Sequence, residues 1–311
     1  MGSIRMYCDR KFKYGLLHKL MPLTTLYGGS PSTRVIGNTT TGLIPEVLHP
    51  SLLAYQAALA GASYAMTRTE IDAVNNLIYG MVGCGLWTKM NAIYLFIGGT
   101  AATNKFNLKD PRDADAAFRL VFNGTWTHSS TGSKGNGSNA WADTFLVPNT
   151  TLTTTSGHLA YYSRTQIQEA LAIEIGCQNA SSTLTAMALA RSGTNISSFR
   201  YGSDAAGATP TLSGTNSQGL FVGSQTGSGI NDRNIYRNGI KGSAQTATGT
   251  TSLPTTAKIA INAFNNNNTT RQYYSSKECA YASIGSGLSA IDNRNLYIIV
   301  QNFQTALGRQ V

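Results

Sequence analysis

Charged side chains are scarce in this sequence: Asp, Glu, Lys and Arg together make up 12% of the 311 residues. Carboxylates are the scarcer sign, with 14 acidic residues against 24 Lys and Arg, and this shortage produces the net charge of +10. The surface must therefore consist largely of Thr, Ser, Asn and Gly, which is typical of an extracellular or particle-bound β-protein. Basic residues concentrate only at the N-terminus, whereas a nucleic-acid-binding domain usually presents a basic stripe with interleaved aromatics. We therefore expect no nucleic-acid partner.

Cysteine and long apolar runs are also lacking. The four cysteines are Cys8, Cys84, Cys177 and Cys279. Metal sites usually take ligands in pairs a few residues apart, and neither these cysteines nor the four histidines are so spaced. We therefore expect free thiols, with no metal and no cofactor. No run reaches the ~18 apolar residues of a membrane span, and the basic N-terminus lacks the apolar core of a secretory signal, so no membrane partner is expected.

The first 66 residues are interpreted as an extended N-terminal arm. Pro and Gly recur too often between residues 21 and 50 for a long regular element, yet apolar residues are spread among them. A segment of this kind is either disordered or laid along a partner's surface, and the apolar residues favour the second. Within the arm, residues 51–65 predict a short helix ending near Gly61. The residues expected to contact the partner are Arg5, Arg10, Lys11, Phe12, Lys13 and Tyr14.

Two capping boxes predict helices on either side of a β-rich region. Thr67 and Glu70 can each satisfy the other's free backbone N–H, and apolar residues at helical spacing follow as far as Gly83. Ser289 and Asp292 repeat the pattern and open a C-terminal helix with Leu296, Val300, Phe303 and Leu307 on its apolar face.

The region between these helices alternates short β-type runs with turn clusters. Strands are expected at residues 118–123, 158–164, 169–175, 184–191, 219–222, 257–264 and 280–284. Asn238-Gly239, between alternating apolar residues, is typical of a type I′ hairpin turn, and residues 127–139 predict a long polar loop. So many short strands indicate a β-sandwich or jelly roll. We therefore predict a mainly-β jelly roll over residues 86–284, in a domain of residues 67–311.

Four segments of the chain carry a resemblance to known proteins. They are Gly85-Leu-Trp-Thr-Lys-Met-Asn-Ala-Ile-Tyr94, Asn104-Lys-Phe-Asn-Leu-Lys-Asp-Pro-Arg-Asp113, Trp126-Thr-His-Ser129 and Phe303-Gln-Thr-Ala-Leu-Gly-Arg-Gln-Val311. They resemble a family of tailed-bacteriophage virion proteins, from phages of Bacteroidetes-type hosts, that carry a concanavalin A-like (laminin G-like) jelly roll. The hairpin Tyr236-Arg-Asn-Gly-Ile240 also looks like a strand pair common in laminin G-like domains. The resemblance covers residues 67–311 and implies a structural or adhesive virion component.

The same fold includes β-glucanases, so carboxylate spacing tests for an enzyme. A retaining glycosidase needs two carboxyl groups about 5 Å apart. Glu169 and Glu174 are the closest pair within one expected strand, and a spacing of five places them on opposite faces. We therefore expect no enzyme and no catalytic residues. Asp110, Asp113 and Asp115 are expected to anchor their loop through Asp–Arg pairs rather than to bind calcium, which requires more oxygen ligands.

Aromatic residues beside the polar loop are candidates for binding a glycan. Exposed aromatic rings can stack on sugar faces, and we expect Trp126, His128 and Trp141 to contact such a ligand. The alternative is that these rings are partly buried in the sheets, as expected for Trp87 and most tyrosines.

The resemblance implies a virion structural protein, a fibre, tail or capsid-decoration component assembled in the bacterial host cytoplasm, and the carboxylate spacing predicts that it is non-enzymatic. Its arm would dock on other virion proteins or on copies of itself in a homo-oligomer, and its jelly roll would contact a host-surface glycan. The alternative is a carbohydrate-binding, lectin-like module or a glycan-degrading enzyme of the same fold.

Overall fold

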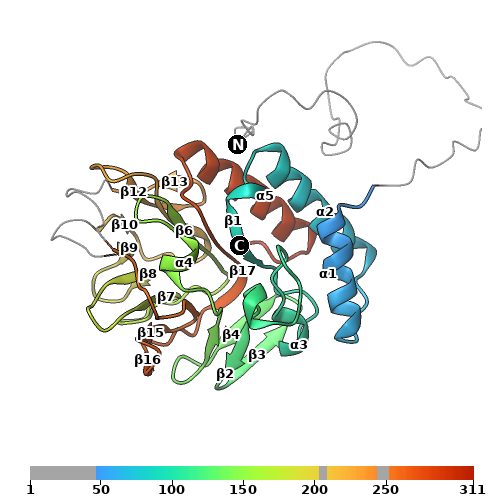
Figure 1. Cartoon of the computed structure of the whole chain (residues 1–311), viewed down its shortest axis with the longest axis horizontal. Coiled ribbons are helices and arrows are strands. Elements are labelled where there is room, and N and C mark those ends of the chain that lie inside the picture. Colours follow the sequence, from blue (N-terminus) through green and yellow to red (C-terminus); the bar gives the residue numbers. More distant parts are fainter. Residues whose placement is uncertain (1–46, 203–208, 244–251) are drawn as a thin grey trace, which may run out of the picture.

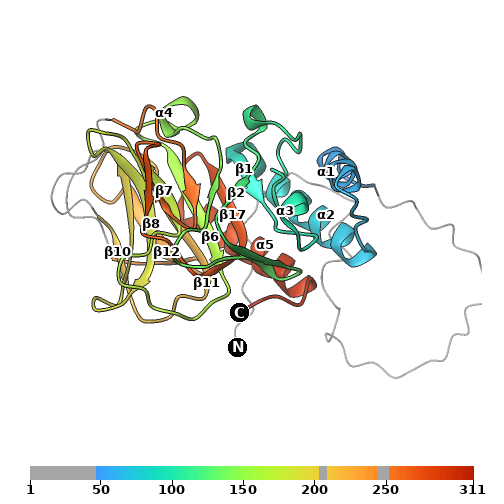
Figure 2. The ribbon, with the colours of Figure 1, turned by 90° about the horizontal axis from the view of Figure 1, so that it is seen from below.

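The computed structural model describes residues 47–202, 209–243 and 252–311. Two β-sheets pack face to face, and helices cover the outside of one of them (Figures 1 and 2). The predicted mainly-β jelly-roll sandwich with flanking helices is thereby confirmed. The predicted arm falls outside the described residues up to position 46, and with it fall Arg5, Arg10, Lys11, Phe12, Lys13 and Tyr14.

The sheet next to the helices, here called the inner sheet, is antiparallel. Its strands in spatial order are β13 (Ile240–Lys241), β12 (Arg233–Arg237), β11 (Gly219–Gln225), β6 (Gly157–Ser163), β17 (Glu278–Gly285), β4 (Gly132–Gly135) and β3 (Trp126–Ser129), and β1 (Met90–Tyr94) also pairs with β17. Both faces of this sheet are buried, because helices cover one and the second sheet covers the other. The central strands β6 and β11 accordingly have no exposed residue.

The second sheet, here called the outer sheet, has one face toward solvent. Its strands in order are β10 (Thr211–Ser213), β9 (Ile196–Gly202), β8 (Leu184–Arg191), β7 (Ile175–Gln178), β14 (Ala260–Ile261), β5 (Trp141–Asp143) and β2 (Val121–Asn123), with β15 (Phe264–Asn266) and β16 (Thr270–Gln272) attached at β7. Side chains alternate between the two faces of a strand. In β8, Met187 and Leu189 therefore enter the core between the sheets, while Ala186 and Ala188 lie on the other face.

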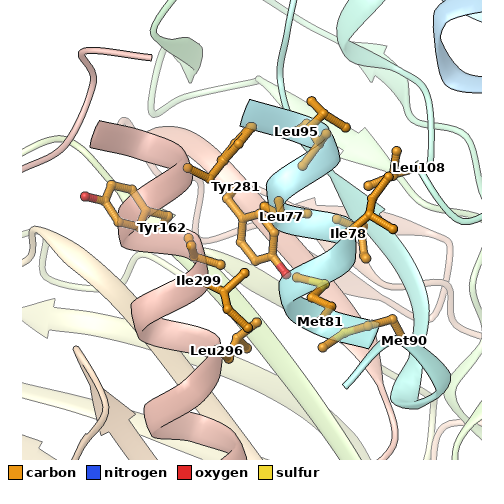
Figure 3. Packing of buried hydrophobic residues seen from close by; sticks show 14 of the residues in the cluster. Leu77, Ile78, Met81, Met90, Leu95, Leu108, Tyr162, Tyr281, Leu296 and Ile299 are labelled. Atoms are coloured by element: carbon orange, nitrogen blue, oxygen red, sulfur yellow. The ribbon is translucent and has the colours of Figure 1, made fainter. Parts of the chain in front are cut away.

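The helix layer consists of α1 (Pro50–Gly61), α2 (Arg68–Gly83) and α5 (Ala290–Ala306), and the short helices are η2 (Trp87–Lys89), α3 (Ala101–Asn104), η3 (Asp115–Ala117) and α4 (Pro148–Thr151). Both predicted capping boxes, at Thr67–Glu70 and Ser289–Asp292, are present. Figure 3 shows α2 and α5 side by side, with Leu77, Ile299 and Tyr281 among the buried side chains of the cluster that joins them to the inner sheet. Burial of such apolar side chains, each contributing about 1.5–3 kcal/mol, attaches the helix layer to the sandwich.

Helix α1 belongs to this packed body rather than to an extended arm. Leu52, Tyr55 and Leu59 are fully buried in the same cluster as α2. The helix ends at Gly61, as predicted from the sequence. The domain boundary expected at residue 66 is therefore too late, because residues 50–61 pack as part of the domain.

The hairpin at Asn238-Gly239 joins β12 to β13, as predicted. Both residues have positive φ, 51° and 74°, which is what a type I′ turn requires. The Asn238 side chain also accepts a hydrogen bond from Leu220 N at 2.9 Å, which ties the turn to β11.

Three other local predictions are wrong. Phe118 has a left-handed φ of 58° that ends a 3-10 turn, so the strand expected at 118–123 shortens to β2. Residues 127–139 form most of the β3–β4 hairpin rather than a long loop. The strand expected at 169–175 is irregular until Ile175, where β7 begins.

The Asp110–Asp115 loop is anchored by ion pairs, as predicted. Arg112 pairs with Asp110, and Arg119 lies 2.9 Å from Asp113 and 2.8 Å from Asp115. The loop is further held by Asn107, whose buried side chain accepts from Ile93 N at 2.9 Å and donates to Ala117 O at 3.0 Å. These contacts give the acidic residues a structural role.

The thiols are only partly as expected. Cys177 and Cys279 are buried and free, and burial raises the pKa of both thiols, so both are protonated and unreactive at neutral pH. Cys84 is disulfide-bonded, so the expectation fails for this residue. Within the described ranges, no helix combines the length and apolar character needed to cross a bilayer.

Candidate functional site

Trp126 and His128 lie together on β3, at the edge of the inner sheet. Their rings are nearly parallel, with centroids 6.0 Å apart and planes at 17°, and Phe122 meets both edge-on. The indole Nε1 donates to Asn123 O at 2.9 Å, and His128 Nδ1 lies 2.9 Å from Ser133 Oγ. Burial lowers the pKa of His128, so the ring is neutral at pH 7. Much of this aromatic cluster is thus engaged within the protein.

Trp141 lies on β5 of the outer sheet, in a different sheet from Trp126. It pairs with Asn123 across β2 and β5, and the Arg271 guanidinium lies 4.1 Å from the centroid of its ring. The three residues expected to bind a glycan are therefore divided between the two sheets, with Trp126 and His128 on one and Trp141 on the other. Whether any of them binds a ligand stays a prediction.

Glu169 and Glu174 converge on one lysine, contrary to the expectation from strand geometry. Lys277 Nζ lies 2.7 Å from Glu169 Oε2 and 2.9 Å from Glu174 Oε1. Ser275 Oγ lies 3.1 Å from an oxygen of each carboxylate and can donate its single proton to either. The reason is that residues 164–174 are irregular, so the alternation of a strand does not apply to them. The argument from opposite faces is therefore wrong.

This cluster has the properties of a structural ion triad. The side chains of Glu174 and Lys277 are fully buried, and that of Glu169 is 17% exposed. Burial alone would raise the pKa of Glu169, but Lys277 and hydrogen bonds from Ser276 outweigh it and lower that pKa. Burial alone would lower the pKa of Lys277, but the two carboxylates raise it. The ammonium between the carboxylates takes the place that a sugar would need in a glycosidase.

A shallow hollow of about 260 Å³ lies on the outer face of the outer sheet. Small side chains form its floor, namely Ala186 and Ala188 of β8 and Ser198 of β9. On this face Ala186 lies between Gly176 of β7 and Arg200 of β9. A Cβ at Gly176 would come within 2.6 Å of the Ala186 methyl, so the floor at this point tolerates no larger side chain.

Larger side chains form the walls of this hollow. Phe264 and Tyr273, from β15 and the end of β16, stand on one side with ring centroids 6.0 Å apart. Tyr273 is 41% exposed. Besides Ser198 of the floor, the polar lining residues are Gln178, Arg191, Arg200 and Gln272, and none of the described residues that line the hollow is acidic. An aromatic wall with a few convergent polar groups is the usual composition of a small-molecule site.

The hollow and Trp141 share one surface. Ala142 enters the core, so the neighbouring Trp141 lies on the solvent side with the hollow. Strands β7 and β5 are separated only by β14, a span of about 10 Å at the usual strand spacing. Strand β16 bridges that span, because Arg271 covers Trp141 while Gln272 and Tyr273 line the hollow.

No protein-family model and no curated protein matches the sequence. Among solved structures, domain 4 of AbnA, an extracellular GH43 arabinanase from Geobacillus stearothermophilus solved with arabinotriose, is 13% identical, with a TM-score of 0.42 over 67% of this chain and 98% of that one. A mutant of Trypanosoma rangeli sialidase is 10% identical, with a TM-score of 0.46 over 76% of this chain and 38% of that one. The NanB sialidase mutant K499G from Streptococcus pneumoniae is 14% identical, with a TM-score of 0.36 over 53% of this chain and 26% of that one. The chain thus spans well under half of either sialidase, and likenesses this weak assign no function.

Proposed function

We propose that this chain is a non-enzymatic carbohydrate-binding module and that the hollow on the outer sheet is its binding site. The observation that carries the proposal is the half-exposed Tyr273 ring beside a floor of small side chains and a wall of amide and guanidinium groups. An aromatic face packs against the apolar face of a sugar ring, while amides and guanidinium groups form hydrogen bonds with its hydroxyls. At about 260 Å³, the hollow is smaller than the roughly 300–1,000 Å³ of pockets for drug-sized ligands. It therefore suits one sugar residue.

The buried triad supports binding without hydrolysis. A glycosidase places two carboxyl groups on either side of the bond that it breaks. Here Glu169 and Glu174 instead share the Lys277 ammonium and lie within hydrogen-bonding distance of the Ser275 hydroxyl. None of these residues is among those that line the hollow.

Glycan-array screening of the full chain, followed by calorimetry on the best ligand, tests the proposal. Tyr273→Ala should weaken binding about tenfold or more, the equivalent of roughly 1.4 kcal/mol, because it removes the exposed ring. Trp126→Ala should leave the affinity unchanged, with folding checked by circular dichroism. The opposite result would place the site at Trp126, and unchanged binding in both variants would refute both surfaces.

We further propose that this module is a displayed component of a bacteriophage virion, docked by residues 1–46 on other virion proteins or on copies of itself. The resemblance of the segments at 85–94, 104–113, 126–129 and 303–311 to phage virion proteins supports this role. The physical argument for the arm is that apolar residues between prolines and glycines would be costly to leave in water.

Deletion of residues 1–46 tests the docking role. His49 caps α1 by accepting from Ser51 N at 3.1 Å and packs on Trp87, so the deletion should end before this residue. We expect a folded domain with unchanged far-UV circular dichroism that no longer incorporates into particles in a phage complementation assay. Normal incorporation of the truncated chain would show that the arm is not an anchor.

A further inference from the structure

We propose that the outer-sheet hollow binds a sugar that carries an acetamido group, such as an N-acetylhexosamine, with its methyl on the apolar floor and its amide bonded to Gln272. The inference rests on the proposed carbohydrate-binding function and adds the chemical class of the ligand. Two observations carry it. One is a separate cluster of apolar side chains around the hollow, and the other is a side-chain amide of the lining that has no partner among the described residues.

The apolar side chains around the hollow form a cluster apart from the one between the sheets and the one beneath the helices. The hydroxyl groups of a plain hexose would gain nothing from such a lining and would lose hydrogen bonds to water against it. A methyl group would instead be removed from water, which favours binding. The lining therefore favours a sugar that presents a methyl group as well as hydroxyls. The members of the cluster, all of which line the hollow, are Ile173, Leu184, Ala186, Ala188 and Phe264.

Gln272 supplies an amide at the wall of the same hollow. Its backbone pairs with Phe264 across β15 and β16, which places it beside the apolar cluster. Its side chain makes no hydrogen bond to any other described residue. A glutamine amide carries two donors and an acceptor, so it can donate to the carbonyl of an acetamido group or accept from its N–H.

A second glutamine of the lining can take the opposite side of the acetamido group. Gln178 lies at the end of β7, and its Nε2 donates to Asn266 Oδ1 at 3.1 Å. Its carbonyl oxygen has no donor among the described residues and stays available as an acceptor. The N–H and C=O of an acetamido group point in opposite directions, so two amides from different strands suit them better than one would.

Each part of the proposed ligand thus has its own group in the hollow. The apolar floor receives the methyl, and Gln272 receives the amide. Tyr273, which is 41% exposed beside Phe264, is left to pack against the sugar ring. Because these groups are separate, the contributions of the methyl and of the amide can be removed one at a time.

Three matched ligands test the inference by NMR titration of the full chain. They are the methyl β-glycosides of N-acetylglucosamine, N-formylglucosamine and glucose, in which the methyl and then the amide are removed. We expect N-acetylglucosamine to bind about tenfold more tightly than glucose, with about three- to fourfold of this due to the methyl. A galactose series with the same three groups is titrated in parallel, and the preference is expected in at least one series.

Gln272→Met keeps the length of the side chain and removes its amide. In this variant the preference for N-formylglucosamine over glucose should fall to about onefold, while the preference for the N-acetyl over the N-formyl sugar should stay. Gln310→Met is the matched control, because Gln310 is exposed near the C-terminus and is not among the residues that line the hollow. Both preferences should survive in the control.

Equal affinities for the three ligands in both series would overturn the inference, and so would a preference for the amide that Gln272→Met leaves unchanged. Either result leaves the proposed function standing if a glycan found on the array still binds and loses affinity in Tyr273→Ala. Absence of binding to every glycan on the array would refute the proposed function and the inference together.

Discussion

Arg309→Met should lower the free energy of unfolding by about 3–5 kcal/mol, the range for breaking a buried charged network. Arg309 is fully buried, and its guanidinium donates to Phe96 O at 3.0 Å, Leu95 O at 2.7 Å and Ala280 O at 3.1 Å. The Leu95 and Phe96 carbonyls directly follow β1, and the Ala280 carbonyl lies within β17. The Arg309 side chain therefore joins β1 and β17 at one end of the inner sheet. Methionine fills a similar volume but leaves all three buried carbonyls without this donor.

Urea denaturation followed by tryptophan fluorescence measures this effect. Arg112→Met is the control, because Arg112 is exposed and its described ion pair is with the neighbouring Asp110. An exposed pair contributes at most about 1 kcal/mol, so we expect a much smaller loss than for Arg309→Met. An Arg309→Met variant as stable as the unmodified chain would show that the three hydrogen bonds do not stabilise the sheet.

Glu174→Gln should have an effect of similar size, again about 3–5 kcal/mol, because it removes one charge from a buried pair. Glu174 Oε1 accepts from Lys277 Nζ at 2.9 Å, and its Oε2 accepts from Leu189 N at 2.7 Å. Glutamine keeps the shape, but its amide nitrogen can only donate, and it no longer neutralises the ammonium. Glu169→Gln is the matched variant and should cost less, because that carboxylate is partly exposed to solvent.

A double-mutant cycle separates the ion pair from the general cost of each substitution. Combining Glu174→Gln with Lys277→Met should recover much of the stability lost in Glu174→Gln alone, since the buried ammonium is then removed as well. Strict additivity of the two losses would mean that Glu174 and Lys277 do not interact.

The same triad predicts a pH profile for stability. The pKa of Glu169 is lowered from 4.5, so its contribution is present above about pH 4.5 and is lost as pH falls through the lower folded value. The pKa of Lys277 is raised from 10.5, so its contribution is present below about pH 10.5 and is lost as pH rises through the higher folded value. The contributions of Glu169 and Lys277 to stability should thus be flat between these limits. In the double variant Glu174→Gln/Lys277→Met, the loss of stability at alkaline pH should be smaller than in the unmodified chain.

The elements that could be predicted from sequence are those fixed by neighbouring residues. Each capping box depends on two residues three positions apart, and both helices begin where Thr67 and Ser289 indicate. The turn at Asn238-Gly239 is equally local, since each of the two residues supplies one positive φ. The capping boxes and the turn could therefore be recognised without knowledge of the tertiary fold.

The triad and the hollow depend on contacts that are distant along the chain. Glu169 and Lys277 are separated by 108 positions, and the irregular backbone before β7 defeats the alternation rule that placed Glu169 and Glu174 apart. The hollow joins a floor from β8 and β9 to a wall from Phe264 and Tyr273. Its floor consists of alanine and serine, which carry no sequence signal for binding, whereas the tryptophans do. The alternation of small and large residues in β8 is the one feature of the sequence that indicates the floor of the hollow.

Alanine-methyl NMR can show whether a sugar binds in the hollow on the outer sheet. The floor carries the Ala186 and Ala188 methyl groups, whereas Ala142 lies in the core beside Trp141, and Ala140 lies near the β3–β4 hairpin. Titration with an oligosaccharide that binds the chain should shift the Ala186 and Ala188 signals in a saturable way and leave the Ala140 signal in place. Saturable shifts confined to Ala140, with Ala186 and Ala188 unmoved, would contradict the account and place the site at the Trp126 cluster.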